Sequence, residues 1–195
     1  ADEKKIEQYN EAVKGLSATD WFEKGSALAD SGKYKEAINA YNRVIELAPL
    51  AANAYYNRGI AYVDLGNYQQ AINDFNKAIE LNPQDVEAYS NRGVAYSGLG
   101  NYQQEIKDYN KAIQLNPKYA KAYYNLGIAY GKLGNHQQAI NDLNKAIQLN
   151  PKDAAAYYNR GLTYGRDLGN QQQAINDYNK AIELKPQYAN AYNNR

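Results

Sequence analysis

The chain contains 195 residues and has a formal net charge of +1, from 22 basic and 21 acidic residues. This balance predicts no strong attraction to nucleic acid or to an anionic membrane. Cysteine is absent, which excludes disulfides, thiol catalysis and thiolate metal sites, and no apolar run approaches the roughly 18 residues of a membrane-spanning helix.

The cellular compartment stays open. The chain begins at Ala1 and contains no Met, so either it is a trimmed product or a leader has been removed. We expect a soluble protein, either cytoplasmic or exported after removal of a leader.

Residues 1–17 are predicted to be helical. They place Ile6, Tyr9, Val13 and Leu16 at spacings of three and four residues, which puts these side chains on one face of a helix. Two interpretations remain open. The segment is either a capping helix or the degenerate second helix of an earlier repeat.

A nine-residue segment then recurs at a fixed period. AYYNRGIAY at 54–62 returns as AYSNRGVAY at 88–96, AYYNLGIAY at 122–130 and AYYNRGLTY at 156–164, so successive starts lie 34 residues apart. A period of this length predicts stacked copies of one supersecondary unit. The resulting blocks are 18–51, 52–85, 86–119, 120–153 and 154–188, followed by 189–195 as the truncated first helix of a sixth repeat.

Each block is predicted to form a hairpin of two helices. In the second block the first helix covers about 52–65 and ends before Gly66-Asn67, and the second covers 68–81. Pro83 closes the block because proline cannot continue a helix. One proline serves each block in this way: Pro49, Pro83, Pro117, Pro151 and Pro186.

The apolar pattern indicates how the two helices pack. Tyr55, Gly59 and Tyr62 share one face of the first helix, and Gly59 lacks a side chain where the second helix can come close. The matching stripe of the second helix consists of Ala71, Phe75, Ala78 and Ile79. One hairpin is too small to be stable alone, so neighbouring hairpins must stack.

These positions resemble the tetratricopeptide repeat. The matching residues of the second block are Tyr55, Gly59, Tyr62, Ala71, Phe75, Ala78 and Pro83, and counterparts recur in every block over about 18–195. The resemblance implies an all-α fold, a right-handed superhelical solenoid of antiparallel helix hairpins. It also implies that the first helices line a concave groove.

Four departures from the family pattern are visible. Val44 replaces Ala in the first block, Leu143 replaces the aromatic residue in the fourth, and Glu105 replaces Ala in the third. We expect Glu105 to loosen the third hairpin locally. The fifth block has one extra residue near Arg166-Asp167, which we expect to lengthen or bulge the helix end before Gly169.

No enzyme motif is present, and we predict a non-catalytic protein without cofactor or metal. The single histidine, His136, occupies a position that is Tyr in other blocks, so packing is its expected role. The second helices of the second to fifth blocks each carry an Asp three residues before a Lys, which predicts weak ion pairs on a solvated face. These aspartates are Asp74, Asp108, Asp142 and Asp177. The first-helix arginines Arg58, Arg92 and Arg160 are expected to lie over the hairpin surface.

The sixth position of each first helix is the main candidate for function. It points away from the face that packs, yet it is Asn57, Asn91, Asn125, Asn159 and Asn194. A carboxamide offers both a donor and an acceptor, so a row of them could hold the backbone of an extended peptide. The resemblance implies this role, whereas recent duplication of the repeats would explain the asparagines without any function.

Further candidates flank the asparagines. The aromatic residues Tyr56, Tyr124 and Tyr158 at the fifth position either contact a ligand or pack against the neighbouring first helix. The thirteenth position changes from acidic in the first two blocks to basic in the last two. Some members of the family bind a C-terminal carboxylate through a clamp of Lys and Asn side chains. Lys121 with Asn125 resembles one half of that clamp, while the other half of the clamp is missing.

The expected function is a protein-protein interaction scaffold that binds an extended peptide segment of a partner in the concave groove. The alternative is a structural array that assembles through its open C-terminal end, by end-to-end stacking or as a dimer. A fragment or a consensus-type design is a variant of that alternative. A nucleic-acid role with stacking Tyr and Arg is disfavoured by the neutral charge balance.

Overall fold

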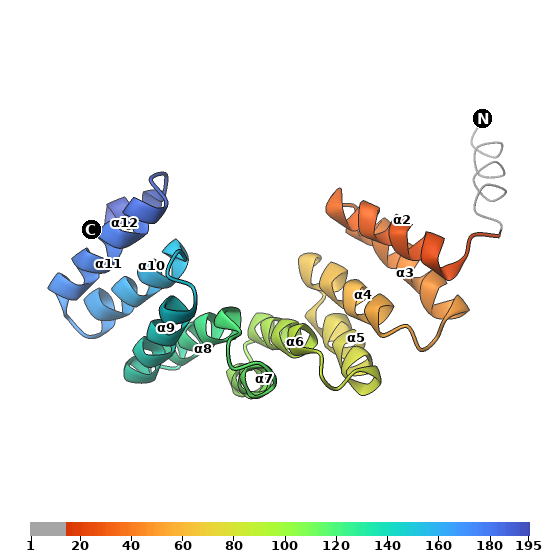
Figure 1. Ribbon diagram of the computed structural model, residues 1–195, viewed down its shortest axis with the longest axis horizontal. Helices are drawn as coiled ribbons and strands as arrows, with labels where there is room; N and C mark the ends of the chain where they lie inside the picture. The colour runs from red at the N-terminus through yellow and green to blue at the C-terminus, as the bar shows by residue number, and fades with distance from the viewer. Residues whose placement is uncertain (1–14) are drawn as a thin grey trace. The chain divides into compact units, whose positions relative to one another are not determined.

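The computed structural model describes residues 15–195, and this part of the chain is built from helices (Figure 1). The predicted helix at 1–17 lies almost entirely outside the described residues. The helices are α2 (Ala18–Asp30), α3 (Tyr34–Leu47), α4 (Ala52–Asp64), α5 (Tyr68–Leu81), α6 (Val86–Gly98), α7 (Tyr102–Leu115), α8 (Ala120–Lys132), α9 (His136–Leu149), α10 (Ala154–Leu162), η1 (Thr163–Asp167), α11 (Gln171–Leu184) and α12 (Ala189–Asn194). None of the described helices is both long and apolar enough to cross a membrane.

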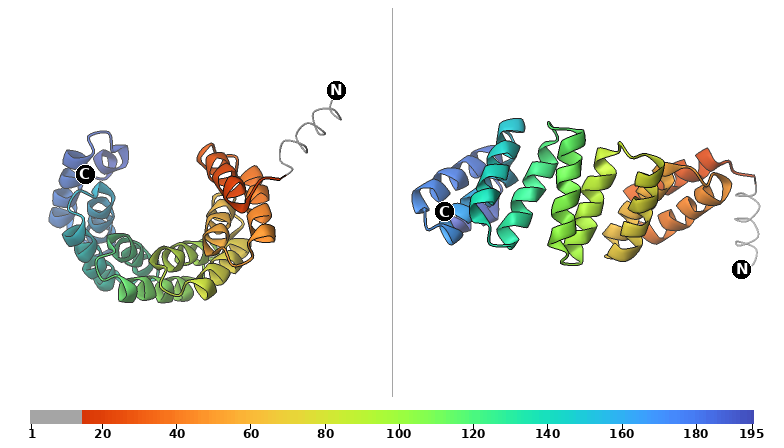
Figure 2. Two further views of the ribbon diagram at one scale, coloured as in Figure 1. Left: turned by 45° about the vertical axis from the view of Figure 1, so that its right-hand side comes forward. Right: turned by 90° about the horizontal axis from the view of Figure 1, so that it is seen from below.

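The chain divides into two compact units, one ending at Pro83 and the other beginning at Gln84. The first contains the hairpins α2/α3 and α4/α5. The second contains α6/α7, α8/α9 and α10/α11, followed by α12. Within each hairpin the two helices lie side by side and antiparallel (Figures 1 and 2). The predicted all-α solenoid of helix hairpins is confirmed.

Helix ends fall where glycine and proline predict them. Helix α4 ends at Asp64, and Gly66 then adopts a φ of +74°, which suits a residue without a Cβ. The N–H of Asn67 donates to the carbonyl of Tyr62 at 2.8 Å and so closes the helix end. Helix α5 ends at Leu81, two residues before Pro83. The sequence-based boundaries are therefore correct to within a residue in this block.

Close contact between the two helices of a hairpin depends on the glycine of the first helix. A Cβ atom built at Gly59 would lie 2.8 Å from Cε1 of Phe75, so any side chain there would displace the ring. At Gly93 in the third hairpin the corresponding distance to Tyr109 is 2.7 Å. The third hairpin, which contains Glu105, therefore keeps the same close approach of its two helices.

The extra residue of the fifth block is absorbed by a π-helical turn, as the predicted bulge required. After α10 the chain forms η1, in which the N–H of Leu168 donates to the carbonyl of Thr163 at 3.1 Å. This bond spans five residues instead of four, so one extra residue fits without breaking the helix. Gly169 follows with a φ of +67° and ends the turn.

The second-helix aspartates differ from the prediction of a solvated face. Asp177 is 4% exposed and pairs with Arg160, whose Nε and Nη2 donate to its two carboxylate oxygens at 2.8 and 2.6 Å. The same bidentate pair joins Arg58 to Asp74 and Arg92 to Asp108. The lysines three residues later bind elsewhere, as Lys180 does with Glu183. The prediction of i to i+3 surface pairs was wrong, and each arginine instead ties the two helices of its hairpin together.

The fourth hairpin lacks this pair. Leu126 stands where the second, third and fifth hairpins have arginine, and Asp142 is nevertheless buried, with 7% of its surface exposed. Its carboxylate accepts a hydrogen bond from Gln138 Nε2 at 3.1 Å. Burial raises the pKa of Asp142, and the hydrogen bond from Gln138 offsets only part of that rise.

We expect Asp142→Asn to raise the free energy of unfolding at neutral pH by on the order of 1 kcal/mol, because the buried charge disappears. The raised pKa means that protonation favours the folded state. The stability that this carboxyl group contributes is therefore complete below its ordinary pKa of 3.8 and is lost as pH rises through the raised value. The gain should be largest at pH 7 and should shrink towards zero near pH 4 in urea unfolding curves.

The matched control is Asp177→Asn in the fifth hairpin. That carboxylate has the Arg160 partner, so the same substitution should destabilise the protein at pH 7. A gain of stability from both variants would contradict the assignment of Asp142 as the uncompensated charge.

Candidate functional site

Each unit contains a surface hollow between consecutive first helices, and the two hollows use the same repeat positions. In the first unit a cavity of about 370 Å³ is lined by Tyr41 of α3 and by Asn57 of α4. In the second unit a cavity of about 320 Å³ is lined by Tyr109 of α7 and by Asn125 of α8. The sixth-position asparagine and the core aromatic residue of the preceding second helix therefore meet at both hollows.

The charge at the rim differs between the two hollows. Asp30 and Asp64 line the hollow of the first unit, and both are exposed. Lys132 occupies the equivalent thirteenth position in the second unit, and its ammonium group donates to Ser97 Oγ at 3.0 Å. The acidic-to-basic change predicted along the thirteenth position therefore places different charges beside a constant carboxamide.

The sixth-position asparagines are half-buried, not exposed as the sequence indicated. Asn57 Nδ2 donates to the carbonyl of Asn53 at 2.9 Å, one turn earlier in its own helix. Asn159 Nδ2 donates both to the carbonyl of Ala155 at 2.9 Å and to the hydroxyl of Tyr124 at 3.0 Å. These bonds hold the N–H₂ end of the amide against protein and leave the carbonyl oxygen Oδ1 as the remaining acceptor.

A bond from asparagine to tyrosine connects adjacent first helices in the second unit. Asn194 Nδ2 donates to the hydroxyl of Tyr158 at 2.9 Å, as Asn159 does to Tyr124. In each case the fifth-position tyrosine belongs to the preceding repeat. The sixth position is thus partly explained by packing between repeats, which sequence reasoning missed.

Asn125 is the exception in this row. The fifth position of the preceding repeat is Ser90, which is fully buried and replaces the tyrosine. Asn125 Nδ2 is buried and has no hydrogen-bond partner among the described residues. Asn91 is half-buried on α6. The five asparagines therefore share a position but not an environment.

Two of the fifth-position tyrosines, Tyr56 and Tyr158, have a ring contact within their own hairpin. The ring centroids of Tyr56 and Phe75 lie 6.0 Å apart, and those of Tyr158 and Tyr178 lie 5.9 Å apart. Burial raises the pKa of Tyr124. All three predicted tyrosines are half-buried, so part of each ring still faces solvent.

Lys121 and His136 complete the residues singled out in the sequence. Lys121 is exposed on α8, whereas the amide nitrogen of Asn125 is buried, so the two members of the half-clamp differ in accessibility. His136 begins α9, and its Nδ1 lies 3.2 Å from Asp167 Oδ2 on the π-helical turn. Within residues 15–195 no group of three or more metal-ligating side chains converges.

Glu105 is a buried acid beside the second hollow. Only 2% of this residue is exposed, and its Oε2 atom has no hydrogen-bond partner among the described residues. Burial raises the pKa of Glu105, and the nearby Ser97, Lys132 and Tyr109 offset only part of the rise. The only sequence signal for this feature was the replacement of a repeated alanine.

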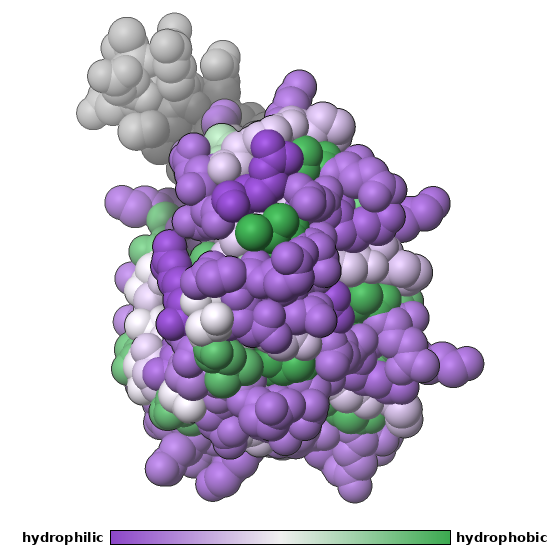
Figure 3. All heavy atoms as spheres, turned by 90° about the vertical axis from the view of Figure 1, so that its left-hand side faces the viewer, coloured by the Kyte–Doolittle hydropathy of each residue, from purple (hydrophilic) through white to green (hydrophobic). Residues whose placement is uncertain are grey.

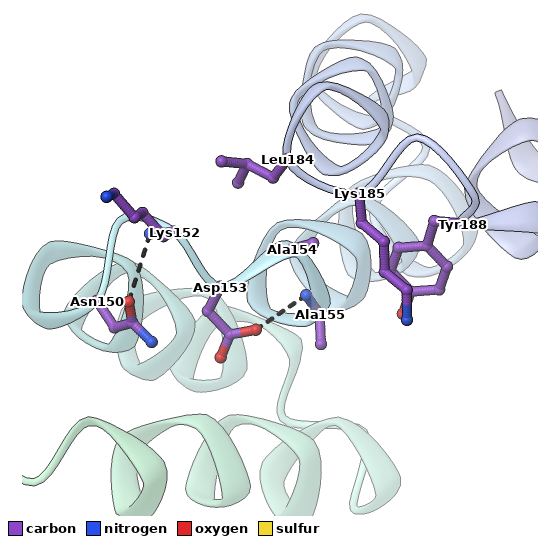
Figure 4. Close-up of a pocket in the computed structure, with 8 residues that line it drawn as sticks. All are labelled: Asn150, Lys152, Asp153, Ala154, Ala155, Leu184, Lys185 and Tyr188. Carbon is purple, nitrogen blue, oxygen red and sulfur yellow. Dashed lines mark hydrogen bonds between the residues drawn. The ribbon is translucent and has the colours of Figure 1, made fainter.

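A third hollow, of about 630 Å³, lies at the loops of the fourth and fifth repeats (Figure 4). Lys152, Lys185 and Tyr188 line it. Asp153 also lines it, but its Oδ1 accepts from the N–H of Ala155 at 2.9 Å and caps α10. The carboxylate of Asp153 therefore caps α10. None of the residues that line this hollow has a buried side-chain polar atom without a hydrogen-bond partner.

The molecular face shown in Figure 3 is mostly hydrophilic, with hydrophobic residues in small separate groups. Large apolar patches are typical of permanent protein interfaces, and no such patch is seen on this face (Figure 3).

Sequence profiles of repeat families match most of the chain. A profile described as TPR repeat matches 25–66, 61–100, 98–134 and 166–195, and two described as tetratricopeptide repeat match 120–153 and 143–176. A search of curated proteins gave no match.

Solved structures with a similar fold include MamA, which is 31% identical with a TM-score of 0.75 over 88% of this chain and 93% of that chain. MamA from Desulfovibrio magneticus RS-1 is 23% identical, with a TM-score of 0.79 over 90% of this chain and 98% of that chain. YrrB, described as a TPR protein with an unusual peptide-binding site, is 24% identical with a TM-score of 0.71 over 95% and 96%. The last two show similarity of fold alone. With its repeated Gly, aromatic and Pro positions now seen as stacked hairpins, the chain belongs to the tetratricopeptide repeat family.

Proposed function

We propose that the chain is a non-catalytic scaffold that binds an extended peptide segment of a partner protein along its first helices. The observation that carries this proposal is the repeated hollow, in which a constant asparagine lies beside a side chain of changing charge. A constant group suits the peptide backbone, and a variable group suits side chains. Members of this family generally act as scaffolds for protein partners, which agrees with the proposal.

The asparagine geometry favours recognition of backbone N–H groups. In Asn57 and Asn159 the amide nitrogen already donates to the carbonyl one turn earlier, so the free acceptor of the side chain is Oδ1. An extended peptide presents N–H groups at regular intervals and can donate them to such oxygens. This arrangement binds a segment without reading its side chains.

The hollows supply the selectivity. Each has room for about ten water molecules at the volume of liquid water, which is enough space to admit a side chain. The hollow with Asp30 and Asp64 favours a cationic group, whereas Lys132 disfavours a cation at the other. Peptide binding is also what is described for YrrB, which shares the fold.

The test compares peptide-array binding by the purified chain and by a variant carrying Asn91→Ala, Asn125→Ala and Asn159→Ala. We expect affinity for bound peptides to fall about tenfold or more, since each net hydrogen bond contributes about 0.5–1.5 kcal/mol. The control variant replaces Asn73, Asn141 and Asn176, which are equally repeated but exposed on second helices. Equal binding by all three proteins would contradict the asparagine mechanism.

Light scattering on the same samples tests the alternative, a structural array that assembles through its C-terminal end. A mass that stays at the monomer value across concentrations, together with peptide binding, would support the scaffold. A mass that rises with concentration in the absence of peptide would favour the self-assembling array.

A further inference from the structure

The third repeat departs from the others at two buried positions. The twentieth position is alanine in the other four repeats, and each of these alanines is at most 1% exposed: Ala37, Ala71, Ala139 and Ala174. Glu105 takes this place in the third repeat and is equally buried. Ser90 likewise replaces a fifth-position aromatic residue and is fully buried. A carboxylate where a methyl group fits costs stability unless it has a partner.

Two polar atoms beside the second hollow lack such a partner. Glu105 Oε2 is an acceptor, and Asn125 Nδ2 is a donor, and neither forms a hydrogen bond within the described part of the chain. Both residues line the same cavity, together with the rings of Tyr109 and Tyr124. Because buried polar groups in native proteins are nearly always paired, an acceptor and a donor at one cavity indicate a ligand group that supplies both partners.

The charges around the cavity select a neutral group. Lys132 lies at the rim, held by Ser97 Oγ at 3.0 Å and over the ring of Tyr102 at 5.3 Å from its centroid. Because Lys132 and Glu105 carry opposite charges, each attracts the ion that the other repels, and neither a cationic nor an anionic side chain is favoured by both. A primary carboxamide is neutral and carries both an N–H₂ donor and a carbonyl acceptor.

We propose that this cavity is a subsite for the side chain of an Asn or Gln residue in the bound segment. The carboxamide N–H₂ donates to Glu105, and its carbonyl oxygen accepts from Asn125 Nδ2. The proposal rests on the proposed function, since a segment must lie along the first helices to deliver the side chain. The hollow of the first unit has Ala37 at the position of Glu105 and so lacks the acceptor.

The subsite is tested without any peptide by NMR of the ¹⁵N-labelled full chain. Propionamide is titrated as the side-chain analogue, with n-butylammonium and propionate as charged probes, and the side-chain amide signals of Asn125 are followed. We expect saturable shifts with propionamide and weaker ones with either ion. Absence of saturable shifts, or tighter binding of n-butylammonium, would overturn the proposal.

Glu105→Ala is the decisive variant because it restores the residue of the other repeats and should keep the fold. Propionamide binding should weaken about tenfold or more, since hydrogen bonds to charged groups are among the strongest. The control Lys107→Ala changes an exposed residue of α7 that does not line the cavity and should leave the affinity unchanged. Unaltered propionamide binding by Glu105→Ala would remove Glu105 from the site.

Peptides with one varied position separate this proposal from the function on which it rests. Wild-type protein should prefer Gln or Asn over Glu, Lys and Leu at that position, and Glu105→Ala should lose the preference for Gln and Asn. Peptide binding without this preference would refute the subsite alone. If propionamide binds the protein but none of the peptides does, the peptide function is refuted and the subsite stands.

Discussion

Replacing Arg160 with leucine should lower the free energy of unfolding by about 3 kcal/mol, because removing one partner of a buried ion pair leaves the other charge uncompensated. The Asp177 side chain is 6% exposed, and the pairing with Asp177 raises the pKa of the Arg160 guanidinium. The lost contacts also include the bond from Arg160 Nη1 to Asn144 Oδ1 at 2.7 Å. Urea unfolding of the full chain at pH 7 measures the difference.

Two further variants make that result specific. Arg43→Leu removes an exposed ion pair with Glu46, in which both side chains are more than half exposed, and should cost less than about 1 kcal/mol. Adding Asp177→Asn to Arg160→Leu should recover part of the loss, because the stranded charge is then gone. An equal loss in Arg43→Leu and Arg160→Leu would show that burial of the pair contributes nothing.

The repeat architecture could be predicted because its signals are local. The glycine and the proline that end the helices of the second block act within a few residues of the chain, and Gly66 and Pro83 fixed those ends correctly. The glycine of the first helix and the aromatic residue of the second also identified the closest contact of the hairpin. Even the extra residue of the fifth block led to a bulge, which the structure resolves as η1.

The arginine pairs could not be predicted by the same means. Arg58 and Asp74 stand sixteen residues apart, and their contact depends on how α4 lies against α5. The rule applied to Asp74 considered only its own helix, where a lysine three residues later offered a nearer partner. Arg recurs at one position of the first helix, and Asp recurs at one position of the second helix. In the fourth block the Arg is missing and the Asp is present without it. This joint pattern was a signal in the sequence that the prediction did not use.

The sequence predicted where the candidate residues lie on their helices, but not which side chains surround them. The period located Asn125 and Asn159, and helix geometry placed them opposite the packed face. That geometry says nothing of the first helix of the preceding repeat, whose Tyr124 contacts Asn159 and half-buries the amide. Glu105 was expected to disturb packing, whereas it lies beside a cavity with an unsatisfied oxygen. Both differences arise from contacts between repeats, which no single block encodes.

Replacing Phe75 with alanine should have the largest effect on the first unit, a loss of about 3–5 kcal/mol in the free energy of unfolding. The side chain is completely buried and fills the space left by the missing Cβ of Gly59. It also contacts the ring of Tyr56, whose centroid lies 6.0 Å away. Its removal leaves a cavity between α4 and α5, and Gly59 on the facing helix has no side chain to fill it.

The fourth hairpin provides the control, since Leu143 naturally occupies the position of Phe75 and is 1% exposed. Phe75→Leu should therefore cost less than about 1.5 kcal/mol, as a large apolar side chain still fills the site. Urea unfolding followed by circular dichroism gives the overall stability, and hydrogen exchange at α4 and α5 shows whether the loss is local, as expected where each repeat contacts only its neighbours. Similar losses from Phe75→Ala and Phe75→Leu would mean that the aromatic ring itself, and not the filled volume, holds this hairpin together.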